Sequence, residues 1–396
     1  MNILSITYEY APIGGGGGVV AAALNEHLAE QGHRVRVVTS RMRGLPARER
    51  IGGVEVRRVR CWRRHRHYTT APELSTTLIG SYRAACEMVR AERPDLIHAH
   101  FVVPSGWVAR RVARRFRIPY VLTAHGSDIP GYNPDRFANL HRILAPAWRR
   151  IMADAAAVTS PSAYLAGLVR RRIDLPIHVV PNGYSPGSTQ GREKRDLVLV
   201  VARLFPRKGV EHFIDAVRDL ATDWELVIAG DGPCLAELKA RAGGETGRIR
   251  FVGFVDKPTL RGLYEEARVM VFPSLRENFP MVLLEAMDAG CAVITTDAEG
   301  CAEVIGDAGL VVPKGDAAGI RDALRTLVDD HDLREELSRR ARARVEQFRW
   351  PRLCGLYQDR FEAAVEHAGS RAESTFAPTA PEKHEGGGRD ADERVA

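Results

Sequence analysis

The chain has 396 residues, of which 45% are hydrophobic and 27% are charged, so it is long enough for two globular domains. Its net charge of +7 combines a basic first half, with 27 basic and 13 acidic residues over 1–190, and an acidic second half, with 30 and 37. No apolar run approaches a membrane span, and the amino terminus lacks the features of a signal peptide, so we expect a cytoplasmic protein. The six cysteines include no Cys-x-x-Cys pair, which argues against a disulfide framework or a zinc knot.

Four short apolar runs in the first half predict parallel strands, at 3–6, 35–38, 96–99 and 120–123, with helices between them, such as 19–31 and 77–93. The alternation starts again in the second half. There we expect strands at 197–201, 225–229, 250–253, 269–272 and 292–295, and helices near 209–221, 233–242, 258–267, 281–289 and 316–329. This alternation is typical of doubly wound α/β domains, so the sequence predicts two of them facing a cleft.

The domain boundaries follow from changes in composition. The prediction is a first domain over 1–182, a polar, turn-rich linker over 183–196 and a second domain over 197–347. A helix over 348–368 is expected to cross back onto the first domain. The tail, 369–396, is polar and rich in Pro, Gly and Glu, so we expect it to be disordered.

Two segments concentrate the positive charge of the first half. Residues 57–68 combine arginine with Trp, His and Tyr, and residues 108–117 alternate apolar and basic positions at helical spacing. The second pattern predicts a helix with one buried stripe and one cationic face. That face is either a solvated outer surface or a contact for anionic lipid headgroups or an anionic acceptor, which would attach the protein peripherally to the inner face of a membrane. No recognised nucleic-acid module accompanies the charge, so we expect no nucleic-acid partner.

A run of five glycines, Gly14 to Gly18, follows the first predicted strand and opens a helix. Glycine in this position lets backbone amides approach a phosphate or a sugar, although a purely structural turn remains open. A dinucleotide site would place an acidic residue near the end of the second strand, where this chain has Thr39 and Ser40. The dehydrogenase interpretation is therefore disfavoured.

Charged residues follow the predicted strands of the second half. Arg203 and Lys208 come between a strand and a helix, where they can neutralise a diphosphate without a metal. Glu277 lies in the loop after another strand and Glu285 in the helix that follows. In open α/β sheets ligands bind in such loops, and the free amides of a helix start suit a phosphate. The alternatives are a solvated loop for the cations and simple helix stabilisation for the carboxylates.

No metal site is predicted. His98 and His100 share one face of a strand and either pack in the core or the cleft, which we favour, or bind a metal. The internal Asp-x-Asp at 330–332 is expected to be a surface feature.

Taken together, these motifs resemble those of the family 4 (group 1) retaining glycosyltransferases of the GT-B fold, an α/β fold of two Rossmann-like domains that face an interdomain cleft. The similarity covers nearly all of residues 1–365. It rests on the glycine loop, on Arg203 with Lys208, on Glu277 with Glu285, and on further motifs at Gly32-His33, Thr123–Asp128, Val180–Gly183, Gly230–Pro233 and Phe251–Val255.

The resemblance implies a role for each matched residue. Glu285 would bind the nucleotide ribose, Arg203 and Lys208 the diphosphate, and Glu277 the hydroxyls of the donor sugar. His125 would lie over that sugar. Asp128 would lie on the acceptor side, and the remaining donor-binding positions would be Gly15, Gly16, Gly17, Gly230, Val255, Asn278, Phe279, Pro280 and Met281.

The implied activity is transfer of a hexose or amino-hexose from a nucleotide sugar, with a UDP-sugar as the leading choice, to an unidentified acceptor hydroxyl. Front-face displacement would retain the anomeric configuration without a metal or other cofactor. The acceptor would be a glycolipid, a polysaccharide or a natural product such as an aminocyclitol antibiotic. Alternatives are a GT-B-fold epimerase or phosphorylase and a non-enzymatic nucleotide-sugar-binding module. The five glycines, Asn278 in place of a frequent glycine, and Cys301 within a usual Gly-Gly pair depart from the family pattern and leave the donor open.

Overall fold

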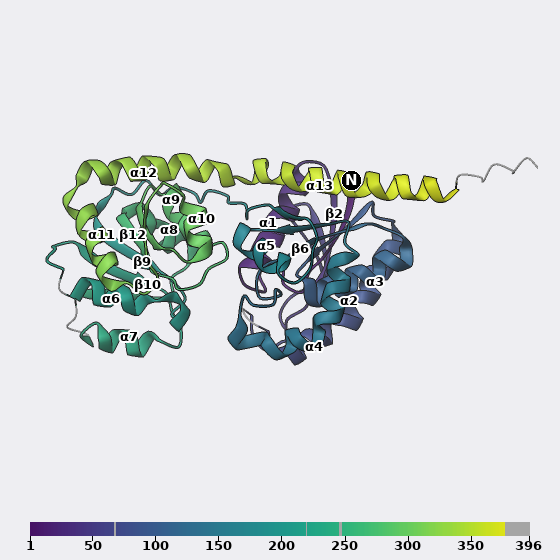
Figure 1. The fold of residues 1–396 in the computed structure, drawn as a ribbon, viewed down its shortest axis with the longest axis horizontal. Helices are drawn as coiled ribbons and strands as arrows, with labels where there is room; N and C mark the ends of the chain where they lie inside the picture. Colours follow the sequence, from purple (N-terminus) through teal and green to yellow (C-terminus); the bar gives the residue numbers. More distant parts are fainter. Residues whose placement is uncertain (67–68, 219, 245–247, 377–396) are drawn as a thin grey trace, which may run out of the picture.

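The computed structural model of the protein describes residues 1–66, 69–218, 220–244 and 248–376. Two α/β lobes lie side by side, and the last two helices run end to end along both of them (Figure 1). Each lobe is built on a largely parallel sheet covered by helices. The prediction of two doubly wound domains is confirmed.

The first lobe contains an eight-stranded sheet in the order β3-β4-β2-β1-β5-β6-β7-β8. Its strands are β1 Asn2–Ile6, β2 Arg34–Ser40, β3 Arg48–Ile51, β4 Val54–Val59, β5 Leu96–His100, β6 Tyr120–Thr123, β7 Ala157–Ser160 and β8 Ile177–Val179. Its helices are α1 Gly16–Glu30, α2 Ala71–Ala91, the short turn η1 Val102–Gly106, α3 Trp107–Phe116, α4 Pro134–Ala153 and α5 Ala163–Arg170.

The second lobe contains a six-stranded sheet in the order β11-β10-β9-β12-β13-β14. Its strands are β9 Arg195–Val201, β10 Glu225–Ala229, β11 Ile249–Gly253, β12 Ala267–Phe272, β13 Ala292–Thr296 and β14 Leu310–Val312. Its helices are η2 Pro206–Lys208, α6 Val210–Arg218, α7 Leu235–Arg241, α8 Lys257–Glu266, α9 Met281–Asp288, α10 Glu299–Ile305, α11 Ala317–Asp329 and α12 His331–Val345, and the turn η4 Glu346–Phe348 leads to α13 Trp350–Phe376.

The central strands are easy to predict because helices cover both faces of each sheet. Residues 197–201 of β9, for example, form an unbroken apolar run that is at most 8% exposed. The sequence analysis did not predict the hairpin of β3 and β4, which pair antiparallel at the edge of the first sheet. Its two-residue turn, Gly52 and Gly53, has positive φ at both positions, as a tight hairpin requires. The pair of glycines between the two short strands was the available signal.

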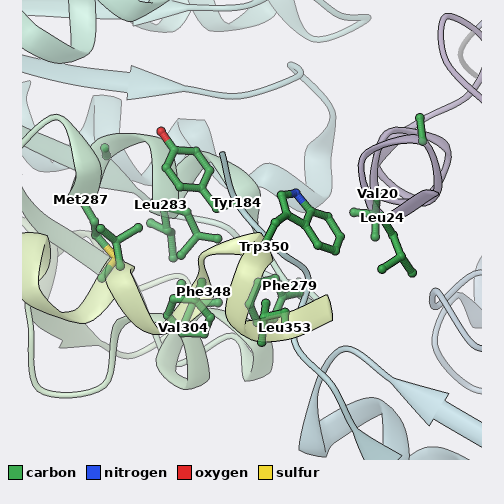
Figure 2. Packing of buried hydrophobic residues seen from close by; sticks show 14 of the residues in the cluster. Val20, Leu24, Tyr184, Phe279, Leu283, Met287, Val304, Phe348, Trp350 and Leu353 are labelled. Atoms are coloured by element: carbon green, nitrogen blue, oxygen red, sulfur yellow. The ribbon is translucent and has the colours of Figure 1, made fainter. Parts of the chain in front are cut away.

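The chain crosses between the lobes twice, and the two crossings touch. The Tyr184 N–H donates to the Phe348 carbonyl oxygen at 2.7 Å, just before Trp350 begins α13. Trp350 is 2% exposed, and its indole lies between Tyr184 and the α1 residues Val20 and Leu24 (Figure 2). The junction is therefore packed rather than a loose linker.

Helix α13 covers the first lobe, where it contacts α1, β5 and β6. It continues to Phe376, so the expectation of disorder from Gly369 onward is wrong for 369–376. Arg371, Ala372 and Glu373 in this stretch are good helix formers, and the composition of the whole tail concealed this. Residues 377–396, which the sequence analysis expected to be disordered, lie outside the described residues.

Helix α3 has the two faces that its sequence predicts. Val108, Ala109, Val112 and Ala113 are at most 6% exposed, while arginines occupy the opposite face. Among the described residues, no helix combines the length and apolar character needed to cross a bilayer.

The junction generates a stability prediction. A Cβ added at Gly183 would lie 2.1 Å from Cδ2 of Trp350, so we expect Gly183→Ala to lower the free energy of unfolding by about 1 to 3 kcal/mol. The control is Gly355→Ala in α13, where a Cβ meets nothing within 4 Å, which should stabilise the protein by up to about 1 kcal/mol. Calorimetric melting of both variants tests this, and equal melting temperatures would contradict it.

Candidate active site

A cavity of about 880 Å³ lies between the two lobes. Its walls come from loops that follow strands β1, β5 and β6 of the first lobe and β9 and β12 of the second. These are the carboxyl ends of parallel strands, where open α/β sheets bind ligands. Most of the predicted site residues line it, namely Gly15, Gly16, Gly17, His125, Asp128, Arg203, Lys208, Glu277, Asn278, Phe279, Pro280 and Met281.

The glycine loop forms one wall of the cavity. The Gly15 N–H donates to Oε2 of the buried Glu9 at 3.0 Å, and α1 begins at the next residue. A Cβ at Gly16 would meet nothing within 4 Å, whereas a Cβ at Gly17 would lie 2.5 Å from Cζ of Phe101. The backbone at the start of α1 is therefore open to the cavity on one side and packed tightly on the other.

His125, which follows β6, is held as a neutral imidazole. Its Nε2 lies 3.0 Å from Nδ1 of His100, and its ring packs at a tilt against Phe101, with centroids 4.5 Å apart. Burial lowers the pKa of His125 to about 3, so the ring carries no charge near neutral pH. Because Nε2 is used on His100, Nδ1 is the nitrogen left for a ligand.

His98 and His100 pack in the core below His125, as the favoured interpretation predicted. Both side chains are fully buried, and His98 Nε2 lies 2.8 Å from Oγ1 of Thr123. The His98 ring also packs against Phe361 of α13, with centroids 5.0 Å apart. Within the described part of the chain, no three His, Cys, Asp or Glu side chains converge to hold a metal.

Asp128 organises the turn that carries His125. Its Oδ1 accepts from the backbone N–H groups of His125 at 3.1 Å and Gly126 at 2.8 Å, and its Oδ2 accepts from the Val102 N–H at 2.8 Å. Burial raises the pKa of this carboxyl, and the three backbone donors oppose that rise. The geometry thus gives Asp128 a positioning role, and its contact with an acceptor stays a prediction.

Lys208 and Glu277 form an ion pair in the second-lobe wall, and both side chains are largely buried. Ser274 Oγ also donates to Oε1 of Glu277, at 3.0 Å. Burial lowers the pKa of Lys208, while Glu277 raises it in compensation. Water solvates a buried ion pair of this kind poorly, and its hydrogen bonds keep it in place. A ligand can therefore stabilise either partner, by presenting a negative charge to Lys208 or hydroxyl groups to Glu277.

The second-lobe wall is rich in cations. Arg203, Arg207 and Arg276 line the cavity beside Lys208, against one carboxylate, Glu277, on the same side. The sequence analysis did not select Arg207 or Arg276 as site residues. Each directly precedes a predicted site residue in the sequence, Lys208 or Glu277, and this adjacency was the signal that could have identified them.

Three predicted donor-binding residues do not line the cavity, and the structure leaves their roles untested. Glu285 Oε2 accepts from the Tyr264 hydroxyl at 3.1 Å, one helical turn beyond Met281. Gly230 has a φ of +143°, and a Cβ there would lie 1.8 Å from the Ala202 carbonyl oxygen, so its glycine serves close backbone packing. Val255 is partly buried against the apolar core.

Sequence reasoning missed the apolar and aromatic part of the first-lobe wall. Besides Tyr8 and Phe101 it includes side chains from α2 and α4, namely Leu74, Leu140, Leu144 and Trp148. Helix α4 was not predicted at all. Phe101 adopts a φ of +73°, which is uncommon for a residue with a side chain and which no sequence pattern indicates.

Two family descriptions match the chain in succession. "Glycosyl transferase 4-like domain" matches residues 15–183, and "Glycosyl transferases group 1" matches residues 186–344. The boundary between them falls at the junction of the two lobes.

Individual proteins match over most of their length. The chain is 27% identical to N-acetyl-alpha-D-glucosaminyl L-malate synthase of Bacillus anthracis, covering 90% of this chain and 96% of that protein. It is 28% identical to an uncharacterized glycosyltransferase of Methanocaldococcus jannaschii, covering 93% and 100%. Among solved structures, Anabaena HepE in complex with UDP is similar with a TM-score of 0.70 at 18% identity, covering 92% and 100%. These similarities confirm the expected GT-B fold.

The neutral histidines in the cavity wall and in the core below it generate a prediction for pH. The pKa of His98 and of His125 is about 3 in the folded protein, against about 6.5 in an unfolded chain. Between these values the unfolded chain binds the extra protons, so stability rises with pH, by up to about 1.4 kcal/mol per pH unit for each histidine. We expect His98→Gln to flatten this rise in melting temperature, whereas His331→Gln, at an exposed position, should leave it unchanged. If melting temperature rises equally with pH in the His98 variant and in the parent protein, the assignment of His98 as a buried neutral histidine is refuted.

Proposed function

Because this chain belongs to the group 1 glycosyltransferases, we propose that it is a retaining enzyme that transfers a hexose or amino-hexose from a UDP-sugar to an acceptor hydroxyl. The observation that carries the proposal is that one cavity is lined by neutral His125 of the first lobe and by Arg203, Lys208 and Glu277 of the second. The similarity to HepE, which binds UDP, supports a uridine donor.

The cations of the second lobe suit the donor diphosphate. In the proposed complex Arg203 and Lys208 bind the phosphates, and this releases Glu277 from its ion pair to accept hydroxyls of the sugar. The phosphates approach the start of α9, where Met281 offers an uncapped helical N–H. The nucleoside then extends along α9 toward Glu285 for the ribose and Val255 for the base.

The state of the carboxylates favours front-face displacement over a double displacement. Among the described residues that line the cavity, the carboxylates are Glu9, Asp128 and Glu277. Glu9 accepts from the glycine loop, Asp128 from three backbone amides, and Glu277 pairs with Lys208. In the proposed complex Glu277 exchanges Lys208 for hydroxyls of the sugar, so none of these carboxylates is left without a partner to act as a nucleophile beneath the sugar.

The proton path of the reaction follows from the pKa of His125. With a pKa of about 3, this ring is too weak a base to deprotonate an acceptor near neutral pH. We therefore assign His125 Nδ1 to a hydrogen bond with a hydroxyl of the donor sugar. The departing phosphate oxygen takes the acceptor proton, and the cations stabilise the charge on the nucleotide, so that no metal is required.

The acceptor side is the apolar first-lobe wall, formed in part by Leu140, Leu144 and Trp148. Such a wall accommodates a sugar face, an aromatic ring or a lipid chain. Glycolipid, polysaccharide and natural-product acceptors, including aminocyclitols, all remain candidates.

Contact with an anionic membrane is a further part of the proposal. The exposed face of α3 presents Arg111, Arg114 and Arg115. Two large apolar side chains on neighbouring helices are also exposed, Ile79 on α2 by 67% and Ile143 on α4 by 75%. Basic and apolar groups together on one lobe favour peripheral binding to acidic lipids.

The decisive experiment offers UDP-, GDP- and ADP-sugars to the protein. A bound donor raises the melting temperature by mass action, and transfer releases nucleotide only when an acceptor is present. Nucleotide release without any acceptor would favour a hydrolase, and isomerisation of the sugar an epimerase. Release that depends on phosphate would favour a phosphorylase. Binding of the donor without turnover would favour a binding module. Activity that survives a metal chelator supports the metal-free scheme.

Glu277→Gln keeps the shape of the side chain and removes its charge. We expect kcat/KM to fall by about 10²-fold or more, because the variant loses both the sugar contact and the balance of Lys208. Steady-state kinetics with the preferred donor measure the effect. The control is Glu336→Gln on the surface of α12, which should retain the parent rate, and an unaltered rate in the Glu277 variant would exclude the assigned role.

Sedimentation with vesicles of anionic or neutral lipid tests the membrane contact. We expect a triple change of Arg111, Arg114 and Arg115 to Gln to weaken binding to anionic vesicles by about a hundredfold, since each cation is worth about 1 kcal/mol there. The same charge is removed in the control by changing Arg325, Arg339 and Arg340 on the second lobe to Gln. Equal losses in both triple variants, or binding that salt does not weaken, would contradict a specific contact.

A further inference from the structure

The side chain of Asn278, in the loop between β12 and α9, reaches across the boundary between the lobes. Its Oδ1 accepts from Ser162 Oγ at 2.5 Å, and its Nδ2 donates to the His125 carbonyl oxygen at 3.2 Å. The residue is only 7% exposed. Both ends of the carboxamide are therefore engaged by the opposite lobe.

The two partners of Asn278 come from neighbouring strands of the first sheet. Ser162 follows β7 and caps α5, where its Oγ accepts from the Leu165 N–H at 3.1 Å. A hydroxyl has one hydrogen and two lone pairs, so this cap leaves its hydrogen for Asn278. His125 follows β6. One carboxamide thus joins two loops at the same edge of the sheet.

The second lobe holds the backbone of Asn278 firmly. The Gly300 N–H donates to the Glu277 carbonyl oxygen at 3.2 Å, and a Cβ on Gly300 would lie 1.9 Å from the Asn278 carbonyl oxygen. Helix α10 therefore packs directly against the peptide that carries the side chain. The same helix makes a separate contact across the boundary, in which Glu303 Oε1 accepts from the Ala163 N–H at 2.7 Å.

We propose that Asn278 is a closing latch, a positioning residue that fixes the His125 turn only when the lobes are closed. When the lobes separate, the His125 carbonyl and the Ser162 hydroxyl lose the carboxamide together and bind water instead. The turn then keeps only its contacts within the first lobe, such as those of Asp128. Closure of the cleft and placement of His125 become one event.

The latch depends on the amide group and not merely on the size of the side chain. Asn278 offers one acceptor and one donor, and these match the Ser162 hydroxyl and the His125 carbonyl. Asn278→Asp has nearly the same shape but presents a carboxylate oxygen to the carbonyl oxygen. It should therefore open the latch as Asn278→Ala does.

Amide hydrogen exchange on the full chain tests the coupling. In Asn278→Asp and in Asn278→Ala we expect faster exchange in segments 125–128 and 162–165 together, and a larger radius of gyration in solution scattering. Ser162→Ala also removes the cap of α5 and should speed exchange in 162–165 in either background, but it should add little to the effect on 125–128 when combined with Asn278→Ala. Glu303→Gln is the matched control, and it should affect Ala163 without affecting 125–128.

Unchanged exchange and scattering in Asn278→Asp would overturn the proposal, as would an equal effect of Glu303→Gln on 125–128. Melting curves establish that the variants are folded, and Ser162→Ala supplies the test if an Asn278 variant is not.

A second measurement rests on the proposed transferase activity. An open latch admits water to the activated sugar, so nucleotide release without acceptor should rise relative to transfer by up to about tenfold in Asn278→Asp. Because the exchange experiment needs no turnover, the two proposals can fail separately. If the protein shows no transferase activity but exchange in 125–128 and 162–165 rises together in the Asn278 variants, the latch holds and the proposed function fails. If transfer is normal and the ratio of acceptor-free nucleotide release to transfer is unchanged in Asn278→Asp, the result counts against the latch.

Discussion

The packing of Trp350 against Gly183 determines how the two lobes face each other. Each of these residues belongs to one of the two chain crossings, and the Tyr184 N–H ties the crossings together at 2.7 Å from the Phe348 carbonyl oxygen. On one side the junction continues into α13, which lies along the first lobe, and on the other into the core below α9 (Figure 2). With the crossings fixed in this way, the carboxyl ends of both sheets face one cavity. Neither lobe contains a complete site, because the cations and the neutral histidine lie in opposite walls.

The two walls present different electrostatic solutions to the same problem of burial. In the first lobe burial holds His125 neutral, and backbone amides hydrogen-bond the Asp128 carboxyl. The second lobe keeps its charges and pairs them, as Lys208 does with Glu277. A diphosphate brings negative charge, so it suits the second wall, while a neutral sugar suits the first. The donor that we propose, a sugar joined to a diphosphate, meets both demands, so the charge distribution and the family membership support the same donor class.

The sequence predicts features that depend on local patterns and misses those that depend on tertiary packing. The apolar runs of β1 or β9 could be read directly, because buried parallel strands leave little choice of residue. The loops of Lys208 and Glu277 were predictable because they follow strands, and ligands bind there in α/β sheets. The apolar wall from α4 was not, since only the fold brings that helix to the cavity. Glu285 shows the opposite limit. The resemblance implies that it binds the nucleotide ribose, and this role stays a prediction, because its carboxylate accepts from Tyr264 outside the cavity lining.

Asn278 illustrates why a departure from a family pattern is hard to interpret without a structure. As a sequence feature it raised only the question of donor identity, because it adjoins Glu277. Its neighbours in space are instead Ser162 and the His125 carbonyl, more than a hundred residues away along the chain. A glycine at this position would leave the carbonyl and the hydroxyl to water even in the closed state. The carboxamide replaces that water with two directional bonds, each of which requires the other lobe. The residue that most directly joins the lobes at the site therefore adjoins the one proposed to bind the sugar, so that movement of the Glu277 loop and movement of the His125 turn are mechanically linked.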